Sequence, residues 1–443
     1  MNIEQTLKEL AEHIAATQKK KKSWQPGEDW VTYSGDVFGA EEYLAALESI
    51  VDGWLVFGKN GSKFEKEFPE LLGKKRGILT NSGSSANLLM VAALKSKSYY
   101  DLPEGSKFIT PVSCFPTTVN PLIQNGYIPI FVDVTLPDLN LDLDQVERVL
   151  AEDPEIKGIA FAHVLGNPPN MDRLMKLVEK HDLIFLEDAC DALGSTYKGR
   201  KLGSYGHMSS CSFYPAHHMT LGEGGFVATN NPRLHKILSS LRDWGRACYC
   251  NTMKAGCVVG ETACGNRFRP WLKKTPEIIY DHRYVYSEIG YNLKPIEMQA
   301  SIGLQQIKRL PYLEAKRREN FSKLTAVFSK YEKYFHLPKA TDGSDPSWFA
   351  YLLTVKDDAP FTRSDIVSYL ESAKIQTRTY FSGNLLLHPA YTHLAIDKDP
   401  VKDFPIASLV AKSSFFMGVY AGIDEDKISY IKKVVDQFFE EIK

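Results

Sequence analysis

A strand runs into a Gly- and Ser-rich turn in Gly77-Ile78-Leu79-Thr80-Asn81-Ser82-Gly83-Ser84-Ser85-Ala86-Asn87. The first four residues predict a short buried strand, and a helical pattern follows over 85–94. Glycine at such a turn lets the backbone approach a ligand closely, and the helix N-terminus and its hydroxyls supply hydrogen-bond donors for a phosphate. An ordinary Ser-rich helix cap has the same composition, so the stretch alone leaves both interpretations open.

Strands and helices alternate from this stretch to about Thr229. Apolar runs rich in β-branched residues predict strands, and the amphipathic runs between them predict helices. The predicted strands include 107–111, 128–134, 158–164 and 183–187, and the predicted helices include 142–150 and 171–181. This alternation predicts an α/β fold with a mostly parallel sheet covered on both faces, whose ligands bind beyond the carboxyl ends of the strands.

The rest of the chain predicts a helical segment before this α/β region and a second domain after it. Apolar residues recur at helical spacing over 1–18, and a strongly helical stretch at 297–330 precedes a smaller α+β pattern. We therefore expect an N-terminal helical segment, a large ligand-binding α/β domain with an irregular Cys-rich loop, and a smaller C-terminal α+β domain. The expected bounds are 1–60 for the segment, 61–310 for the large domain with its loop at 247–284, and 311–443 for the small domain.

The composition is that of an ordinary globular protein. The chain has 443 residues and a net charge of −1, with 44% hydrophobic and 24% charged residues. This balance gives no reason to expect binding to nucleic acid or to an anionic membrane. The N-terminal helix lacks the apolar core of a signal peptide, and no later window has membrane-spanning length. We therefore expect a cytoplasmic protein in a reducing compartment.

Four of the seven cysteines lie close together: Cys248, Cys250, Cys257 and Cys264. Structural disulfides are rare in a reducing compartment, whereas grouped thiolates bind zinc or an iron–sulfur cluster. The Cys-x-Cys spacing is awkward for a tetrahedral zinc site and differs from the common ferredoxin spacings, so the pattern itself leaves zinc and iron–sulfur open. Cys190 is a candidate to replace one of the four as a ligand.

Two other residues, Asp188 and Phe115, stand where a ligand of such a sheet would bind, and Asn292 is a further candidate. Asp188 follows the strand at 183–187, Phe115 follows the strand at 107–111, and Asn292 lies in Gly290-Tyr291-Asn292-Leu293-Lys294. Taken singly, they are more typical of a solvated acid at a strand end, a core phenylalanine and a helix cap.

One further segment, Ser212-Phe213-Tyr214-Pro215-Ala216-His217-His218-Met219-Thr220-Leu221-Gly222-Glu223-Gly224-Gly225, favours a ligand site. It resembles the cofactor segment of the DegT/DnrJ/EryC1/StrS family of sugar aminotransferases, which use pyridoxal phosphate (PLP). In that family a lysine five residues after the serine binds the cofactor as a Schiff base, and here that position holds His217. An imidazole cannot form this bond, but it can accept and return a proton near neutral pH.

The resemblance implies an aspartate-aminotransferase-like fold (PLP fold type I) and a set of cofactor contacts. Asp188 would meet the pyridine nitrogen and keep the ring protonated, so that the ring can absorb electrons from a carbanion. Phe115 would stack on the ring, and Asn292 would reach the phosphate of the neighbouring subunit, which implies a homodimer. The implied phosphate ligands within the chain are Gly83, Ser84, Ser85 and Ser212.

For several other residues the family pattern does not define a role. Asp191 stands where the family usually has Gln or His, so its contact is open. His163 matches a position near the cofactor, whereas His218 is expected to be a hydrogen-bonded structural histidine. Three arginines are candidates to bind the diphosphate of a nucleotide: Arg246, Arg267 and Arg378. Each could equally form a surface salt bridge.

One branch of the family, the nucleotide-sugar 3-dehydratases that make 3,6-dideoxyhexoses, combines histidine at the lysine position with a [2Fe–2S] cluster. The chain resembles enzymes of this branch that act on CDP-4-dehydro-6-deoxy-D-glucose, over most of its length from Asp29 onward. The resemblance implies pyridoxamine phosphate (PMP) as cofactor and electrons from a separate NAD(P)H-dependent flavin or iron–sulfur reductase. The implied cluster ligands are Cys248, Cys250, Cys257 and Cys264.

The predicted reaction is thus C3 dehydration of a nucleotide-linked 4-keto-6-deoxyhexose. A glutamate-dependent 3-dehydratase would share the histidine but need no cluster, and the four cysteines argue against it. An ordinary sugar aminotransferase relies on lysine, which His217 argues against. A non-catalytic homologue that binds zinc is the third alternative, and the retained Asp188, Ser212 and Phe115 argue against such decay.

Overall fold

The computed structural model describes residues 2–21, 24–248 and 267–442, so Cys250, Cys257 and Cys264 lie outside the described residues. A seven-stranded sheet forms the centre, with the strand order β1-β9-β8-β5-β4-β2-β3. β9 runs antiparallel to β1 and β8, whereas the pairs from β8 through β5, β4 and β2 to β3 are parallel. This confirms the predicted mostly parallel sheet. The strand bounds are β1 (Arg76–Thr80), β2 (Lys107–Pro111), β3 (Ile128–Val132), β4 (Ile156–Ala162), β5 (Ile184–Asp188), β8 (Met208–Ser212) and β9 (Gly225–Thr229).

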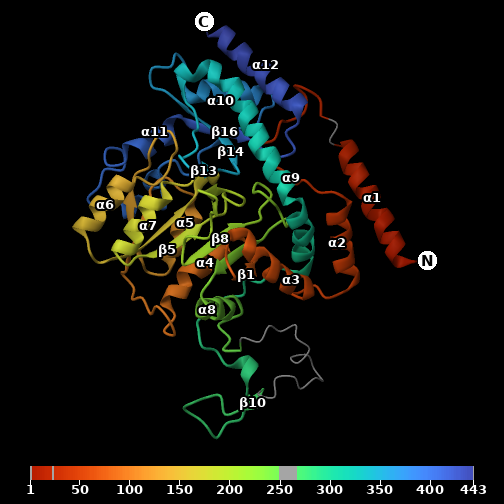
Figure 1. The fold of residues 1–443 in the computed structure, drawn as a ribbon, viewed down its shortest axis with the longest axis vertical. Coiled ribbons are helices and arrows are strands. Elements are labelled where there is room, and N and C mark those ends of the chain that lie inside the picture. The colour runs from red at the N-terminus through yellow and green to blue at the C-terminus, as the bar shows by residue number, and fades with distance from the viewer. Residues whose placement is uncertain (1, 22–23, 249–266, 443) are drawn as a thin grey trace.

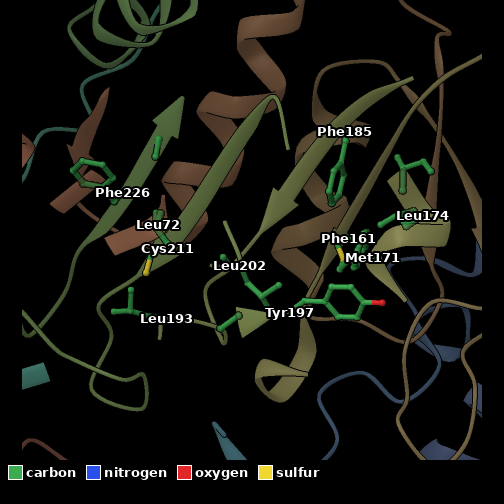
Figure 2. Packing of buried hydrophobic residues seen from close by; sticks show 14 of the residues in the cluster. Leu72, Phe161, Met171, Leu174, Phe185, Leu193, Tyr197, Leu202, Cys211 and Phe226 are labelled. Carbon is green, nitrogen blue, oxygen red and sulfur yellow. The ribbon is translucent and has the colours of Figure 1, made fainter. Parts of the chain in front are cut away.

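Helices cover both faces of this sheet. Successive side chains of a strand point to opposite faces, and accordingly Leu79 packs in one core with Leu174 of α7, while Ile78 packs in another with Leu89 of α4. Figure 2 shows part of the first core, where the rings of Phe161 and Phe185 stack with their centroids 5.4 Å apart. The helices of this region are α3 (Lys59–Glu67), α4 (Gly83–Ala92), α5 (Pro116–Gln124), α6 (Leu143–Glu152), α7 (Met171–Lys180) and α8 (Pro232–Arg242).

A smaller unit is built on a four-stranded antiparallel sheet with the order β12-β14-β16-β15 and has its own core. The long helix α9 (Glu297–Phe328) belongs to both units, because its Leu313 packs in the first core and its Leu324 in this one. Figure 1 shows α9 rising from α2 and α3 toward α10 and α12. It passes 310 and 311 without a break, and the domain bounds stay a prediction. The other elements are β12 (Phe335–His336), β14 (Ala350–Val355), β15 (Arg378–Thr379), β16 (Ser414–Gly418), α10 (Arg363–Ser372), α11 (Pro405–Ser413) and α12 (Glu425–Glu441).

The remaining segments are shorter or peripheral. At the edge of the molecule α1 (Ile3–Lys21) packs beside α2 (Ala40–Val51) (Figure 1). The predicted irregular loop contains, in its described part, a short hairpin of β10 (Phe268–Arg269) and β11 (Tyr280–Asp281). A three-stranded sheet joins β6 (Thr196–Tyr197), β7 (Arg200–Lys201) and β13 (Ser344–Asp345). None of the described helices combines the length and apolar composition needed to cross a membrane.

Candidate active site

A pocket of about 340 Å³ opens beyond the carboxyl ends of β4, β5 and β8. Its position is the one expected for a ligand site on a parallel sheet. Residues that are far apart in the sequence meet there, which the spacing of the motifs alone does not reveal. The pocket is lined by six of the predicted site residues: Gly83, Ser84, Phe115, Asp188, Ser212 and His217.

The start of α4 and the end of β8 form a cradle on one side of the pocket. Ser82 caps the helix, since its Oγ accepts a hydrogen bond from the backbone N–H of Ser85 at 3.1 Å. A Cβ added to Gly83 would lie 2.5 Å from the Cβ of Ser212, so only glycine permits this approach. The free N–H groups of a helix N-terminus together with the Ser212 hydroxyl fit a phosphate. Ser85 is engaged in the cap, and Ser84 lines the pocket in its place.

Asp188 is held firmly at the pocket wall. Its Oδ2 accepts hydrogen bonds from Asn87 Nδ2 at 2.7 Å and from Thr118 Oγ1 at 2.9 Å. Its Oδ1 accepts a third from the backbone N–H of Cys190 at 3.1 Å. Hydrogen bonds to a carboxylate are among the stronger ones in proteins, so this side chain is fixed in direction before any ligand binds. Such a carboxylate fits the nitrogen of a protonated pyridine ring.

Aromatic side chains form another part of the pocket wall. Phe115 keeps 48% of its surface exposed, which is unusual for a phenylalanine and leaves a ring face open to a planar ligand. Its ring meets that of Phe381 edge-on, with centroids 5.7 Å apart. Tyr33 and Phe349 add to this wall. Tyr33 and Phe381 could not be singled out from the sequence, because single aromatic residues are usually core.

The imidazole of His217 lies between Asp191 and Phe349. Its Nδ1 is 3.3 Å from Asp191 Oδ1, at ion-pair distance although not aligned as a hydrogen bond, and its ring centroid is 5.3 Å from that of Phe349. The side chains of His217 and Asp191 are only 15% and 10% exposed. Asp191, where the sequence departs from the family pattern, is therefore the carboxylate beside the imidazole. A neutral imidazole with its hydrogen on Nδ1 accepts protons at Nε2.

The other two predicted histidines have structural contacts. His218 is 2% exposed and its Nε2 bonds the carbonyl of Ser347. Burial, and next the charge of Arg317, lower the pKa of His218 well below its usual value, so the ring is neutral. His163, expected near the cofactor, instead turns away from the pocket and bonds Glu187 Oε1 through Nε2 at 2.9 Å with no exposed surface.

Asn292 and the cysteine group lie apart from the pocket lining. Asn292 is exposed, and its backbone pairs with that of Asp243. Cys248 is half-buried, and across residues 2–21, 24–248 and 267–442 no three His, Cys, Asp or Glu side chains gather as a metal site. Cys190 does line the pocket; burial, and next the charge of Asp188, raise the pKa of its thiol well above the ordinary value.

Comparison with known proteins identifies the family. The model of the DegT/DnrJ/EryC1/StrS aminotransferase family matches residues 37–436. The chain belongs to this family. Among its relatives, the lipopolysaccharide biosynthesis protein RfbH of Salmonella typhimurium is 39% identical over 440 residues, which cover 99% of this chain and 98% of RfbH. The dTDP-4-dehydro-2,6-dideoxy-D-glucose 3-dehydratase of Saccharopolyspora spinosa is 38% identical over 424 residues, covering 95% and 89%.

A solved structure supports the same assignment to the DegT/DnrJ/EryC1/StrS family. The GDP-4-keto-6-deoxy-D-mannose-3-dehydratase of E. coli with bound hydrated PLP matches with a TM-score of 0.79 and 28% identity, covering 92% of this chain and 99% of that one. The predicted PLP fold type I is thereby confirmed. The family and this neighbour support PLP or PMP as the cofactor, and an enzyme of the nucleotide-sugar 3-dehydratase or aminotransferase type.

Proposed function

We propose that this enzyme uses PMP to remove the C3 hydroxyl of a nucleotide-linked 4-keto-6-deoxyhexose. The proposed substrate is CDP-4-dehydro-6-deoxy-D-glucose, and the electrons come from a separate NAD(P)H-dependent flavin or iron–sulfur reductase through a [2Fe–2S] cluster of this chain. One observation carries the proposal: at the position of the family's lysine, a half-buried imidazole lines the pocket with a carboxylate 3.3 Å away. This pair is suited to proton transfer and cannot anchor the cofactor.

The pocket residues would bind PMP without a covalent bond. When bound, PMP supplies an amine that condenses with the sugar ketone and a ring that takes up electrons. Gly83, Ser84 and Ser212 would hold its phosphate, and Ser85 would hold the cap of the helix that presents them, as the cap geometry and the close approach at Gly83 support. Asp188 would hold the pyridine nitrogen, and the exposed ring of Phe115 would cover one face of the cofactor.

His217 would move the protons of the reaction. Asp191 would hold the hydrogen of Nδ1, so that Nε2 takes a proton from the C4′ carbon of PMP. The protonated imidazole would then donate that proton to the departing C3 oxygen, because hydroxide is a poor leaving group without an acid. The aromatic side chains of Phe115, Phe349 and Phe381 would keep water from this proton.

Arg378 is the best placed of the three predicted arginines to bind the substrate's diphosphate. Its guanidinium lies 4.7 Å from the ring centroid of Tyr33, which lines the pocket. Arg267 is instead paired with Asp281 at 2.7 Å, and Arg246 stacks on Trp244. We expect Arg378→Gln to weaken the binding of CDP but not of cytidine, and Arg267→Gln to leave both unchanged. If Arg378→Gln weakens the binding of CDP and of cytidine equally, Arg378 does not bind the diphosphate.

The cysteine group is proposed to hold the [2Fe–2S] cluster, which carries electrons at a potential set by its ligands and surroundings. Cys248 is the one member among the described residues, so support for the cluster comes from the sequence pattern and the resemblance. Anaerobically purified protein should contain about two irons and two sulfides per chain. Stoichiometric zinc without iron would remove the electron-transfer part of the proposal.

A homodimer is proposed because exposed apolar residues surround the predicted partner contact. Trp54, Leu55 and Val56 are each more than half exposed, and Val56 pairs through the backbone with Ile296, close in sequence to Asn292. If Asn292 completes the neighbouring site, mixing His217→Asn with Asn292→Ala subunits gives heterodimers with one intact site. Activity that returns on mixing supports active sites shared between subunits. If each variant is inactive alone and the mixture is also inactive, the sites are not shared.

The decisive experiment is turnover with PMP and a competent reductase. CDP-, TDP- and GDP-4-keto-6-deoxyglucose would be compared, because the dehydratases similar to this chain are named for dTDP and GDP sugars. Release of a 3-deoxy sugar from the CDP substrate, dependent on the reductase, is expected. Deoxygenation that needs glutamate but no reductase would favour the glutamate-dependent alternative, and an amino sugar as product would indicate an aminotransferase.

A further inference from the structure

A buried arginine lies directly behind the His217 turn. Arg317 is in the middle of α9 and is 3% exposed, and within the described part of the chain its side chain donates hydrogen bonds to backbone carbonyls alone. One terminal nitrogen donates to the carbonyls of His217 at 2.7 Å and Ala216 at 3.3 Å. The other donates to those of Phe349 at 3.0 Å and Trp348 at 3.3 Å.

Such a site is costly for a cation, which suggests that the geometry matters. In the described part of the chain, the guanidinium of Arg317 forms no ion pair with a carboxylate, and burial lowers its pKa to about 10, which still leaves it protonated at neutral pH. The planar guanidinium presents its N–H groups in a rigid fork, and here two of its nitrogens each serve a pair of carbonyls. A lysine ammonium has no such fork and cannot bridge both pairs in the same way.

The two carbonyl pairs belong to the two segments that enclose the His217 ring. One pair consists of the carbonyls of Ala216 and His217, so it includes the residue that bears the imidazole. The other pair includes the carbonyl of Phe349, whose ring centroid lies 5.3 Å from that of the imidazole. Asp191 bounds the ring from another side at 3.3 Å. Arg317 also lies between Leu313 and Leu324, the α9 residues that pack in the large and small cores. The guanidinium therefore fixes the turn, the small unit and the long helix to one another.

We propose that Arg317 is a positioning residue that holds the backbone of His217 and of Phe349 and thereby sets the direction of the catalytic imidazole. The inference rests on the proposed function for the role of His217, but not for the geometry of the clamp. Misplacement of a reacting group by about 1 Å can cost about 100-fold in rate. The Arg317→Lys variant keeps the positive charge and loses the fork, so it should fold and yet misplace the ring.

The neighbouring arginine provides a matched control. Arg318, on the same helix, bonds Asp345 at 3.1 Å and the carbonyl of Gly194 at 2.8 Å, and neither bond goes to the His217 turn. Arg318→Lys therefore makes the same chemical change one residue away. Thermal unfolding of both variants would show whether each remains cooperatively folded.

The test reads the imidazole directly, in protein without cofactor. With histidine labelled at Cε1 by carbon-13, the His217 resonance is the one that disappears in His217→Asn. In Arg317→Lys this resonance should shift or broaden and its titration should change, while Arg318→Lys leaves it as in the wild type. In the PMP-bound enzyme, C4′ hydrogen exchange should fall by about 100-fold in Arg317→Lys only. A His217 resonance and titration in Arg317→Lys identical to the wild type would overturn the proposal.

Chemical rescue keeps the proposal testable if Arg317→Lys does not fold. Methylguanidinium, which restores the fork, should return the His217 resonance of Arg317→Ala toward the wild-type position, and methylammonium, which restores only charge, should not. Equal rescue by the two would show that charge alone matters and would also overturn the clamp. If wild-type and His217→Asn proteins exchange the C4′ hydrogen equally, the proposed function fails, and the resonance still decides the role of Arg317.

Discussion

Replacing Gly83 by alanine tests the phosphate cradle where its geometry is tightest. The added methyl group would lie 2.5 Å from the Cβ and 2.8 Å from the Oγ of Ser212, about 1 Å inside normal contact. Neither side can yield easily, because Ser212 is paired in the sheet with Gly225 and the cap at Ser82 fixes the start of α4. The helix end must therefore move away from the strand end. Overpacking of this kind costs about 1–3 kcal/mol of the free energy of unfolding.

The effect on cofactor binding separates the cradle from general stability. Each charge-assisted hydrogen bond lost from the phosphate costs about 1.5–3 kcal/mol, so the Kd for PMP should rise roughly ten- to a hundred-fold per bond. Fluorescence titration with PMP measures the Kd, and urea unfolding measures the stability. Ile431→Val, a buried change in the small core, should lose about 0.5–1.5 kcal/mol with no change in Kd. An unchanged Kd in Gly83→Ala would place the phosphate elsewhere.

Three further outcomes are expected. His217→Lys should bind PLP covalently, detected as visible absorbance that borohydride abolishes, and should lose dehydration; a variant that still dehydrates would contradict a proton-transfer role for His217. Because burial lowers the pKa of His218, the unfolded chain binds more protons, so stability is fully present above about pH 6.5 and falls as the pH drops below it. Urea midpoints across pH should have a shallower slope in His218→Asn, in which His207, His235 and His336, whose pKa values desolvation also lowers, still contribute. An identical slope would show that His218 does not titrate on unfolding. Cys250→Ser should lower the iron and sulfide content, and wild-type content would exclude Cys250 as a ligand.

Much of the central sheet could be predicted, because long apolar strands and amphipathic helices carry a clear period. The predicted strand at 107–111 and helix at 171–181 match β2 and α7 to within a residue. The two-residue strands β6, β7 and β13 could not be predicted, since so short a strand has no period. The partner of β13 is β6, which is also distant in sequence.

Part of the active site could also be predicted from the sequence, and part could not. Motifs on contiguous stretches predicted Gly83, Asp188, Ser212 and His217, which do meet in one pocket. The contact between Asp191 and His217 could not be predicted, because it depends on how the turn after β8 folds over the end of β5. The direction of His163 was also hidden, since adjacent residues of a strand face opposite sides and only the fold shows that Glu187 lies behind it.

The central claim is that the histidine at the lysine position transfers a proton at the cofactor instead of binding it covalently. The most direct measurement is exchange of the C4′ hydrogen of bound PMP with heavy water, followed by NMR in the wild type and in His217→Asn. We expect exchange in the wild type, and retained PMP binding without exchange in the variant. Exchange at the wild-type rate in His217→Asn would contradict this claim.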